Sequence, residues 1–215
     1  MKPFRLDCYF FSQHWHRYDD LFMLLSADER DRAARLKFDD ARRRFVIGRG
    51  LLRTHLADLL TMPPESVQFR YSEHGKPDLD HDTDLRFSVA HSADLLLIAT
   101  ARGRAIGVDV EHLRPVPQMT SLAQSYFTPD EQKCLEHLTG DAQTGYFFRC
   151  WTAREAYVKV SGEGFRSGAF PHISVPPDAA NPYHLQHRDG TPLEGHALET
   201  FIPAEGYIAT VCIEA

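Results

Sequence analysis

Hydrophobic and polar positions along this 215-residue chain change their period several times, which indicates a mixture of strands and helices. Loose alternation near residues 4–11 predicts a first strand, and a similar pattern over residues 207–213 predicts the last one. Four stretches between them also read as strands, and these are residues 67–71, 84–90, 95–101 and 105–111.

Helix signals separate these strands. Residues 26–29 (SADE) form a capping box, in which serine and glutamate each bond the other's backbone amide, and a helix follows to about residue 37. Residues 128–131 (TPDE) repeat this chemistry and open a second helix of the same kind. Two longer helices are predicted, one over residues 39–60 that Met-Pro-Pro ends, and one over residues 144–160 that Gly162 and Gly164 stop.

The two halves of the sequence resemble each other. The two capping boxes lie 102 residues apart, and residues 41–46 (ARRRFV) resemble residues 153–158 (AREAYV) at a spacing of 112. Such short matches also arise by chance. If they are real, the fold is a pseudo-twofold duplication of an α+β unit, with halves at residues 1–103 and 104–215 and an active site in the cleft between them.

Composition excludes several classes of protein. The chain is 43% hydrophobic and 25% charged, as a globular protein is, and no apolar run reaches the roughly 20 residues of a membrane span. The N-terminus lacks the pattern of a secretory signal. The four cysteines are scattered without a C-x-x-C pair, so we predict no zinc site, no disulfide framework and a cytoplasmic location.

The charge of the chain is uneven. A net charge of −6 argues against a nucleic-acid binder, yet nine of the 24 basic residues fall between residues 30 and 53. This cluster suits a polyanionic small molecule or an acidic partner, or it is a solvated helix face paired with nearby acidic residues. The basic residues are Arg30, Arg32, Arg35, Lys37, Arg42, Arg43, Arg44, Arg49 and Arg53.

Paired carboxylates occur in residues 107–111 (GVDVE). On a strand, residues two apart point to the same face, so Asp109 and Glu111 project together. Two adjacent carboxylates repel unless a cation lies between them, and magnesium takes one or two carboxylates together with substrate phosphates. The alternative is an edge strand whose acidic face lies in water.

The helix over residues 144–160 carries a third carboxylate. Trp151, Glu155 and Lys159 lie four residues apart and share one stripe of this helix. A Glu–Lys pair at this spacing is ordinary and is worth only a few tenths of a kcal/mol. The aromatic residues of the stripe favour a partly buried site instead, in which Glu155 joins Asp109 and Glu111 while Lys159 meets a phosphate.

Two shorter segments add weaker signals. His91 and Ser92 follow a strand and could hold a phosphate by charge-assisted hydrogen bonds, and Lys76 lies at the tip of a Gly-Lys-Pro turn. Each is also common at an ordinary protein surface. His14 and His16 could share a strand face, but no third ligand has the spacing of a zinc site.

Together these segments resemble the 4′-phosphopantetheinyl transferases. Residues 75–77 (GKP), 87–92 (FSVAHS), 107–111 (GVDVE) and 151–159 (WTAREAYVK) have the order and spacing of that family. The length and the internal similarity resemble its larger, surfactin-synthetase-activating type, which is a pseudo-twofold duplication. One position departs from the pattern, because Arg154 stands where the family usually has lysine.

The resemblance implies an enzyme that moves the 4′-phosphopantetheine group of coenzyme A to a serine hydroxyl of an acyl or peptidyl carrier protein, releasing 3′,5′-ADP. It implies a monomer, and magnesium held on the pyrophosphate by Asp109, Glu111 and Glu155. Glu155 and Lys159 are then the catalytic residues, with Glu155 as the base. The residues expected to contact coenzyme A are Arg43, Lys76, Ser88, Ala90, His91, Ser92, Asp109, Glu155 and Lys159.

Three other functions fit parts of the sequence. They are a coenzyme A or nucleotide binding protein without catalysis, a basic helix that binds acidic partners or RNA, and a different metal-dependent phosphotransferase. Net charge and the lack of an aromatic-basic RNA-binding pattern argue against the second. The carrier's pathway, the choice between magnesium and manganese, and the division of the arginines between coenzyme A and carrier stay open.

Overall fold

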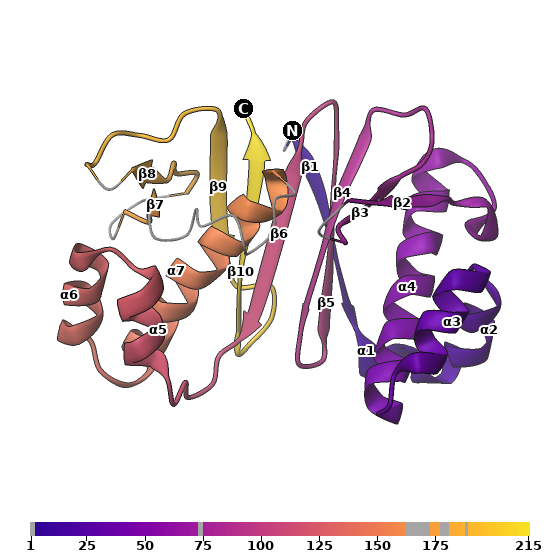
Figure 1. Cartoon of the computed structure of the whole chain (residues 1–215), viewed down its shortest axis with the longest axis horizontal. Coiled ribbons are helices and arrows are strands. Elements are labelled where there is room, and N and C mark those ends of the chain that lie inside the picture. The colour runs from indigo at the N-terminus through magenta and orange to yellow at the C-terminus, as the bar shows by residue number, and fades with distance from the viewer. Residues whose placement is uncertain (1–2, 73–74, 162–172, 177–180, 188) are drawn as a thin grey trace.

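Two sheets lie back to back in the middle of the molecule, and helices cover their outer faces (Figure 1). The computed structural model describes residues 3–72, 75–161, 173–176, 181–187 and 189–215. Within these residues, no helix is both long enough and apolar enough to cross a lipid bilayer.

Each sheet has three antiparallel strands. The first has the order β1 (Phe4–Phe10), β5 (Leu95–Arg102), β4 (Leu85–Ser92), and the second has the order β6 (Ile106–His112), β10 (Tyr207–Glu214), β9 (His196–Phe201). Two short hairpins accompany them, and they are β2 (Phe69–Tyr71) with β3 (Pro77–Leu79), and β7 (Ile173–Ser174) with β8 (Gln186–His187).

The helices form one group on each side. The first group is α1 (Phe11–His14), the 3₁₀ turn η1 (Trp15–Arg17), α2 (Tyr18–Met23), α3 (Ala27–Arg35), α4 (Asp39–Leu60) and the 3₁₀ turn η2 (Pro64–Ser66). The second group is α5 (Met119–Tyr126), α6 (Pro129–His137) and α7 (Gly140–Ser161).

The two halves repeat one topology. In each, the first strand pairs with the last, and the last strand lies between the first and the other long strand. A capping-box helix and a 22-residue helix follow the first strand in both. The predicted α+β fold with two similar halves is therefore confirmed. The boundary between residues 103 and 104 and the cleft between the halves stay predictions.

The internal similarity of the long helices was predicted in the wrong register. α4 begins at Asp39 and α7 at Gly140, so residues 41–46 do not match residues 153–158. The equivalent residues are Arg53 and Arg154, which both lie fourteen positions after the first residue of their helix. Short runs of arginine and alanine produced the false match, whereas the helix starts fix the true one.

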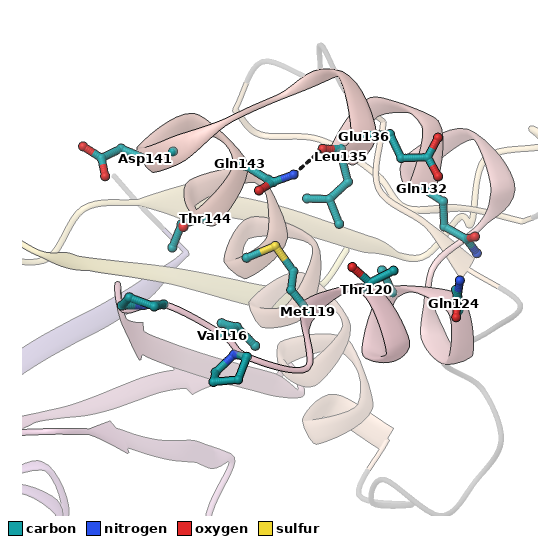
Figure 2. Close-up of a pocket in the computed structure, with 14 residues that line it drawn as sticks. Val116, Met119, Thr120, Gln124, Gln132, Leu135, Glu136, Asp141, Gln143 and Thr144 are labelled. Atoms are coloured by element: carbon teal, nitrogen blue, oxygen red, sulfur yellow. Dashed lines mark hydrogen bonds between the residues drawn. The ribbon is translucent and has the colours of Figure 1, made fainter.

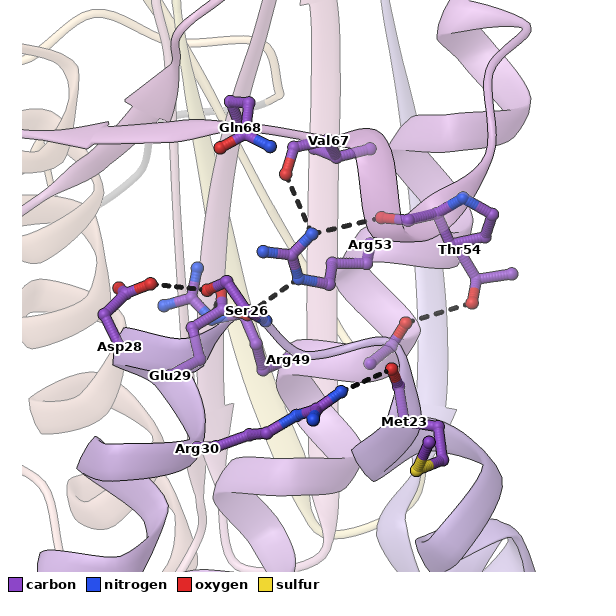
Figure 3. A network of polar contacts seen from close by, with 12 residues as sticks. Met23, Ser26, Asp28, Glu29, Arg30, Arg49, Arg53, Thr54, Val67 and Gln68 are labelled. Atoms are coloured by element: carbon purple, nitrogen blue, oxygen red, sulfur yellow. Dashed lines mark hydrogen bonds and ion pairs between the residues drawn. The ribbon is translucent and has the colours of Figure 1, made fainter.

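A buried ion pair joins the two successive helices of each half. Arg53 donates through Nε to Glu29 at 2.7 Å, as Figure 3 shows, and through Nη1 to the Val67 carbonyl at 2.8 Å. Arg154 donates through Nη2 to Glu131 and to the Ile173 carbonyl. Burial of a charge is costly unless it is paired and hydrogen-bonded, so these pairs fix how the helices dock.

Strand β5 is apolar on both faces because both are covered. Leu95 and Leu97 face β6 and β10 of the second sheet, while Leu96 and Ile98 face α4. The corresponding strand β10 places Cys212 against α7. The unbroken apolar run of β5 is typical of a strand buried between two layers. A strand with one exposed face would instead alternate apolar and polar residues.

Most predicted elements form close to their expected bounds. α4 has the predicted range, and α7 starts four residues before its predicted start at Thr144. The sequence did not reveal β3, β9 or α5. Gly162, Gly164 and residues 73–74 of the predicted turn lie outside the described residues.

Candidate active site

The carboxylates of β6 face helix α7 at very close range. A Cβ atom on Gly107 would lie 2.0 Å from the Ala156 carbonyl oxygen, so only glycine lets the helix approach this strand. Asp109 and Glu111 follow Gly107 at intervals of two residues and lie on the same face. The motif glycine thus brings the β6 carboxylates near Glu155 on α7.

Lys159 links the helix to the strand. Its Nζ donates to Asp109 Oδ1 at 2.7 Å and to the Val108 carbonyl at 3.0 Å. Asp109 is only 9% exposed, and burial raises the pKa of its carboxyl group although the Lys159 ammonium acts in the opposite direction. The pair therefore forms a compact, partly buried charged centre.

Glu155 lies beside this pair. Burial is the main cause that raises the pKa of Glu155 to about 7, and the charges of Asp109 and Glu111 add to it while Lys159 opposes them. All three carboxylates are therefore near enough to repel. A carboxyl group with a pKa near neutrality can accept a proton at physiological pH.

The donor set fits magnesium in its chemistry. Oxygen ligands that repel one another suit a hard divalent cation. No group of three or more His, Cys, Asp or Glu side chains in the described part of the chain is already arranged to hold a metal ion. Lys159 instead occupies one oxygen of Asp109, so metal binding at these residues requires the carboxylates to turn toward a common ion.

A cavity of about 580 Å³ opens in the first half, lined by α3, α4, the 75–77 turn and β4. Its volume lies in the range of small-molecule sites. The charged residues in its wall are mainly cationic, so it suits a polyanion. The titratable residues in the wall are Arg32, Asp40, Arg44, Arg49 and His91.

His91 and Arg44 approach each other in this cavity. The loss of water contact, together with the nearby Lys159 and Arg44 cations, lowers the pKa of His91. Arg44 is held by an ion pair with Asp40 at 2.7 Å and donates to the Ala93 carbonyl next to β4. His91 thus lines the cavity and lies near enough to Lys159 for the charge of that lysine to affect its pKa.

Arg43 faces a different hollow. It lies over the Trp15 ring, 5.8 Å from its centroid, and lines a surface recess together with Asp19 and Asp39. Arg44, which sequence reasoning did not select, lines the cavity with His91. Neighbouring helix residues differ in direction by about 100°, so sequence alone did not decide between them. The predicted contact between Arg43 and coenzyme A stays a prediction.

Arg49 is another cavity residue that the sequence did not single out. Its side chain is only 9% exposed, and it lies over the rings of Phe69 at 4.9 Å and Phe45 at 5.9 Å, with Glu29 at 3.4 Å (Figure 3). Burial lowers the pKa of Arg49. The predicted arginine cluster therefore has members with buried structural roles, such as Arg53, members in the cavity wall, such as Arg44 and Arg49, and members at the surface, such as Arg35.

Lys76 reaches from the first half to the second. Its ammonium donates to the carbonyl oxygens of Lys159 and Val160 in the last turn of α7. Burial lowers the pKa of Lys76, and the Lys159 charge adds to the effect. A cation at this point compensates the exposed carbonyls of a helix end. Its predicted contact with coenzyme A stays untested.

Alternate residues of β4 point to opposite sides. His91 faces the cavity, whereas Ser88, Ala90 and Ser92 face β6, where the Val108 amide donates to Ser88 Oγ at 3.1 Å. Ser92 Oγ donates to Glu111 Oε2 at 2.8 Å. The expected contacts of these three small residues with coenzyme A stay predictions, and their observed partners lie on the second half.

A second hollow of about 460 Å³ lies in the other half, between α5, α6, the start of α7 and the segment before α5 (Figure 2). Its wall has apolar residues such as Met119 and Leu135, amides such as Gln124, and the carboxylates Glu136 and Asp141. Among the residues that the structure describes, no lysine or arginine lines this hollow. A polyanionic ligand is therefore better suited to the arginine-lined cavity.

A carboxylate–ammonium centre and an arginine-lined cavity are chemically suited to a phosphate-containing ligand. Comparisons with known proteins identify the family. The model of the 4′-phosphopantetheinyl transferase superfamily matches residues 105–212, and a model of the N-terminal part of 4′-phosphopantetheinyl transferase matches residues 12–103. Both halves of the duplicated fold are thus represented.

Individual relatives agree with these models. The chain is 36% identical over 197 residues to 4′-phosphopantetheinyl transferase HetI of Nostoc sp., covering 90% of this chain and 80% of the relative. It is 38% identical over 148 residues to putative 4′-phosphopantetheinyl transferase slr0495 of Synechocystis sp., covering 67% and 60%. It is 25% identical over 195 residues to 4′-phosphopantetheinyl transferase Sfp of Bacillus subtilis, covering 87% and 81%.

The chain belongs to the 4′-phosphopantetheinyl transferase superfamily and is an enzyme of this class. The similarity to Sfp supports the larger, surfactin-synthetase-activating type that the motifs resemble. The resemblance based on four short motifs is therefore confirmed.

Proposed function

We propose that this enzyme transfers the 4′-phosphopantetheine group of coenzyme A to a serine hydroxyl of an acyl or peptidyl carrier protein, releasing 3′,5′-ADP in a magnesium-dependent reaction. The observation that carries the proposal is the position of Glu155, which lies partly buried on α7 near Asp109 and Glu111, two carboxylates on one face of β6. The family membership adds the group that is transferred.

The nucleotide end of coenzyme A occupies the arginine-lined cavity. Its phosphates are anionic, and Arg32, Arg44 and His91 offer donors from three different elements. Arg44 is already oriented by Asp40, so little side-chain freedom is lost when a phosphate binds. The pyrophosphate then extends toward the charged centre of β6 and α7.

Asp109, Glu111 and Glu155 would hold magnesium at the pyrophosphate. A bound magnesium ion neutralises charge on the phosphate oxygens and polarises the phosphorus that is attacked. Manganese has the same preference for oxygen ligands, so the donor set suits either metal.

Protein residues carry the proton and the remaining charge. Glu155 accepts the proton of the carrier serine, directly or through a water molecule, as the hydroxyl oxygen forms a bond to the β-phosphorus. The bond to the leaving 3′,5′-ADP oxygen breaks. Lys159 contributes its positive charge to a phosphate oxygen, and Asp109 keeps this ammonium on the strand side of the helix.

A mass spectrum of an apo carrier protein incubated with the enzyme, coenzyme A and magnesium tests this function. The expected result is a carrier that gains one phosphopantetheine group, with 3′,5′-ADP in the supernatant. The KM for coenzyme A should rise about 10-fold or more in Arg44→Ala, which removes a charge-assisted hydrogen bond, and the same assay on Arg43→Ala tests the contact predicted for Arg43. An unmodified carrier in every arm would contradict the proposal.

A further inference from the structure

Strands β4 and β6 lie next to each other where the two halves meet, although they belong to different sheets. The contacts that join them have a constant register. The Val108 amide donates to Ser88 Oγ at 3.1 Å, and the His112 amide donates to Ser92 Oγ at 3.1 Å. The two residues of each pair are twenty positions apart in the sequence. Because this spacing is the same for both pairs, β4 and β6 run in the same direction. In both pairs, the serine hydroxyl accepts from a β6 backbone amide.

Small side chains make this approach possible. Ser88 is 4% exposed and Ala90, which lies between the two serines, is 5% exposed. The opposite strand contributes Val108 and Val110, which are buried in the core between the sheets. A backbone amide that is buried without a partner costs free energy, and the serines supply that partner where the two sheets are not paired.

Ser92 does more than accept this bond. A serine hydroxyl has one hydrogen to donate. Because the oxygen of Ser92 accepts from the His112 amide, its hydrogen is directed to Glu111 Oε2 at 2.8 Å. Arg114 donates to the same oxygen at 2.9 Å. One oxygen of Glu111 is therefore fixed by two donors, and the other carries neither of these bonds.

We propose that Ser92, a residue of the first half, is the positioning residue that orients Glu111 of the second half for metal binding. The proposal rests on the proposed function, because Glu111 is there one of the magnesium ligands. Partners that hold a metal-ligating carboxylate typically affect metal affinity 10- to 100-fold when they are removed. The metal affinity of one half thus depends on the junction with the other.

This role differs from a contact between Ser92 and a phosphate of coenzyme A. A positioning role changes the magnesium dependence and leaves the affinity for coenzyme A intact at saturating metal. A phosphate contact changes the KM for coenzyme A at every magnesium concentration. The two roles are therefore separated by measuring both constants in the same variants.

The experiment uses Ser92→Ala, Ser92→Thr and the control Ser88→Ala, which removes the other junction hydroxyl but touches no carboxylate. For each protein, the half-saturating magnesium concentration and the KM for coenzyme A are measured in the carrier transfer assay. Manganese binding to the enzyme–coenzyme A complex without carrier is measured by titration calorimetry, so one readout does not depend on turnover.

Ser92→Ala should raise the half-saturating magnesium concentration and the manganese dissociation constant about 10-fold, with the KM for coenzyme A at saturating metal within about twofold. Ser92→Thr keeps the hydroxyl and should restore most of the affinity, and Ser88→Ala should leave it unchanged. The proposal is overturned if Ser92→Ala changes only the KM for coenzyme A, or if Ser88→Ala weakens metal binding equally.

Failure of the proposed function gives a different result. If the wild-type enzyme modifies no carrier, the transfer reaction is wrong, and the calorimetric comparison of Ser92→Ala with wild type still tests the positioning role. Absence of any metal binding by the wild-type complex would overturn both.

Discussion

The two halves of the enzyme share one scaffold but carry different chemistry. Both have the same strand order, a capping-box helix and a buried arginine–glutamate pair at equivalent places. Asp7 and Asp109 are each the fourth residue of their first strand. The two halves are thus most similar in the features that determine the fold.

Residues at the same distance from the start of α4 and of α7 also differ between the halves. Glu155 and Lys159 on α7 correspond to Thr54 and Asp58 on α4, counted from the first residue of each helix. The second half thus has a carboxylate and an ammonium where the first has a hydroxyl and a carboxylate. The proposed catalytic centre uses both of these second-half residues.

The residue two positions before each aspartate, which lies on the same face of the strand, also differs between the halves. Arg5 takes the place of Gly107 and neutralises Asp7 through two hydrogen bonds, at 2.7 and 2.9 Å. In the second half, glycine lets the helix approach, and the helix itself provides the cation for Asp109. One glycine therefore decides whether the aspartate is paired within its strand or built into a site.

The largest difference between the halves should appear at Lys159. Lys159→Met removes the charge offered to the phosphate and should lower kcat/KM by about 100- to 1,000-fold. The equivalent change in the first half, Asp58→Asn, should alter it less than about twofold. Steady-state transfer assays compare the two, with melting temperatures to confirm folding. Equal losses would show that the halves are not divided in this way.

The buried ion pairs should be important in both halves. Arg53→Met and Arg154→Met each remove an arginine that pairs with a buried glutamate, and each should lower the free energy of unfolding by about 3–5 kcal/mol, with the Arg53→Met loss at the lower end because Glu29 keeps its ion pair with Arg49. Urea denaturation measures this loss. A much larger loss in one half would mean that only one pair stabilises the duplicated scaffold.

Arg154→Lys tests the position where the chain departs from its family. Arg154 is fully buried and donates to Glu131, Ile173 and Cys150, so it does not face the carboxylate centre. Lysine loses the planar fork, so stability should fall by about 2 kcal/mol while kcat stays within about twofold. A large loss of kcat at unchanged stability would give Arg154 a direct catalytic role.

Gly107→Ala should weaken the close contact that builds the site. Its Cβ would meet the Ala156 carbonyl, so α7 must move, and stability should fall by about 1–3 kcal/mol together with activity. Arg5→Ala at the equivalent exposed position should change stability by no more than about 0.5 kcal/mol. Thermal unfolding of both variants measures the contrast.

The smallest expected effect is the contribution of His55, in the first half, to the pH dependence of stability. His55 stands where the second half has Ala156, and burial lowers the pKa of His55 although Asp7 opposes the effect. At His55 the unfolded chain then binds more protons than the native one, so the contribution of this residue to stability should fall as pH drops from about 7.5 to about 5.5, opposite in sign to that of Glu155. His55→Gln should reduce this fall in urea titrations at the two pH values.

Patterns that act within one element could be predicted from the sequence. The prolines that follow α4 gave its end, and the spacing in GVDVE gave the shared face of Asp109 and Glu111. Contacts between the halves could not be predicted this way. The bonds of Ser88 and Ser92 to β6 depend on how two sheets meet, which local periodicity does not encode.

The direction of side chains on helices was the other limit. Arg43 and Arg44 differ by one position, and only the packing of α4 on α3 and β4 shows which of them lines the cavity. Arg154 kept a charge within a catalytic motif, yet its partners lie in the core. A motif names the residues near a site, but packing decides which of them face it.

The most direct test of the account compares Glu155→Gln with Thr54→Val, the matched change at the equivalent position of the first half. A mass-spectrometric time course follows apo carrier with coenzyme A and magnesium. Loss of the base should slow modification at least about 100-fold in Glu155→Gln, with an unchanged melting temperature, while Thr54→Val keeps the wild-type rate. Near-normal modification by Glu155→Gln would contradict the central claim.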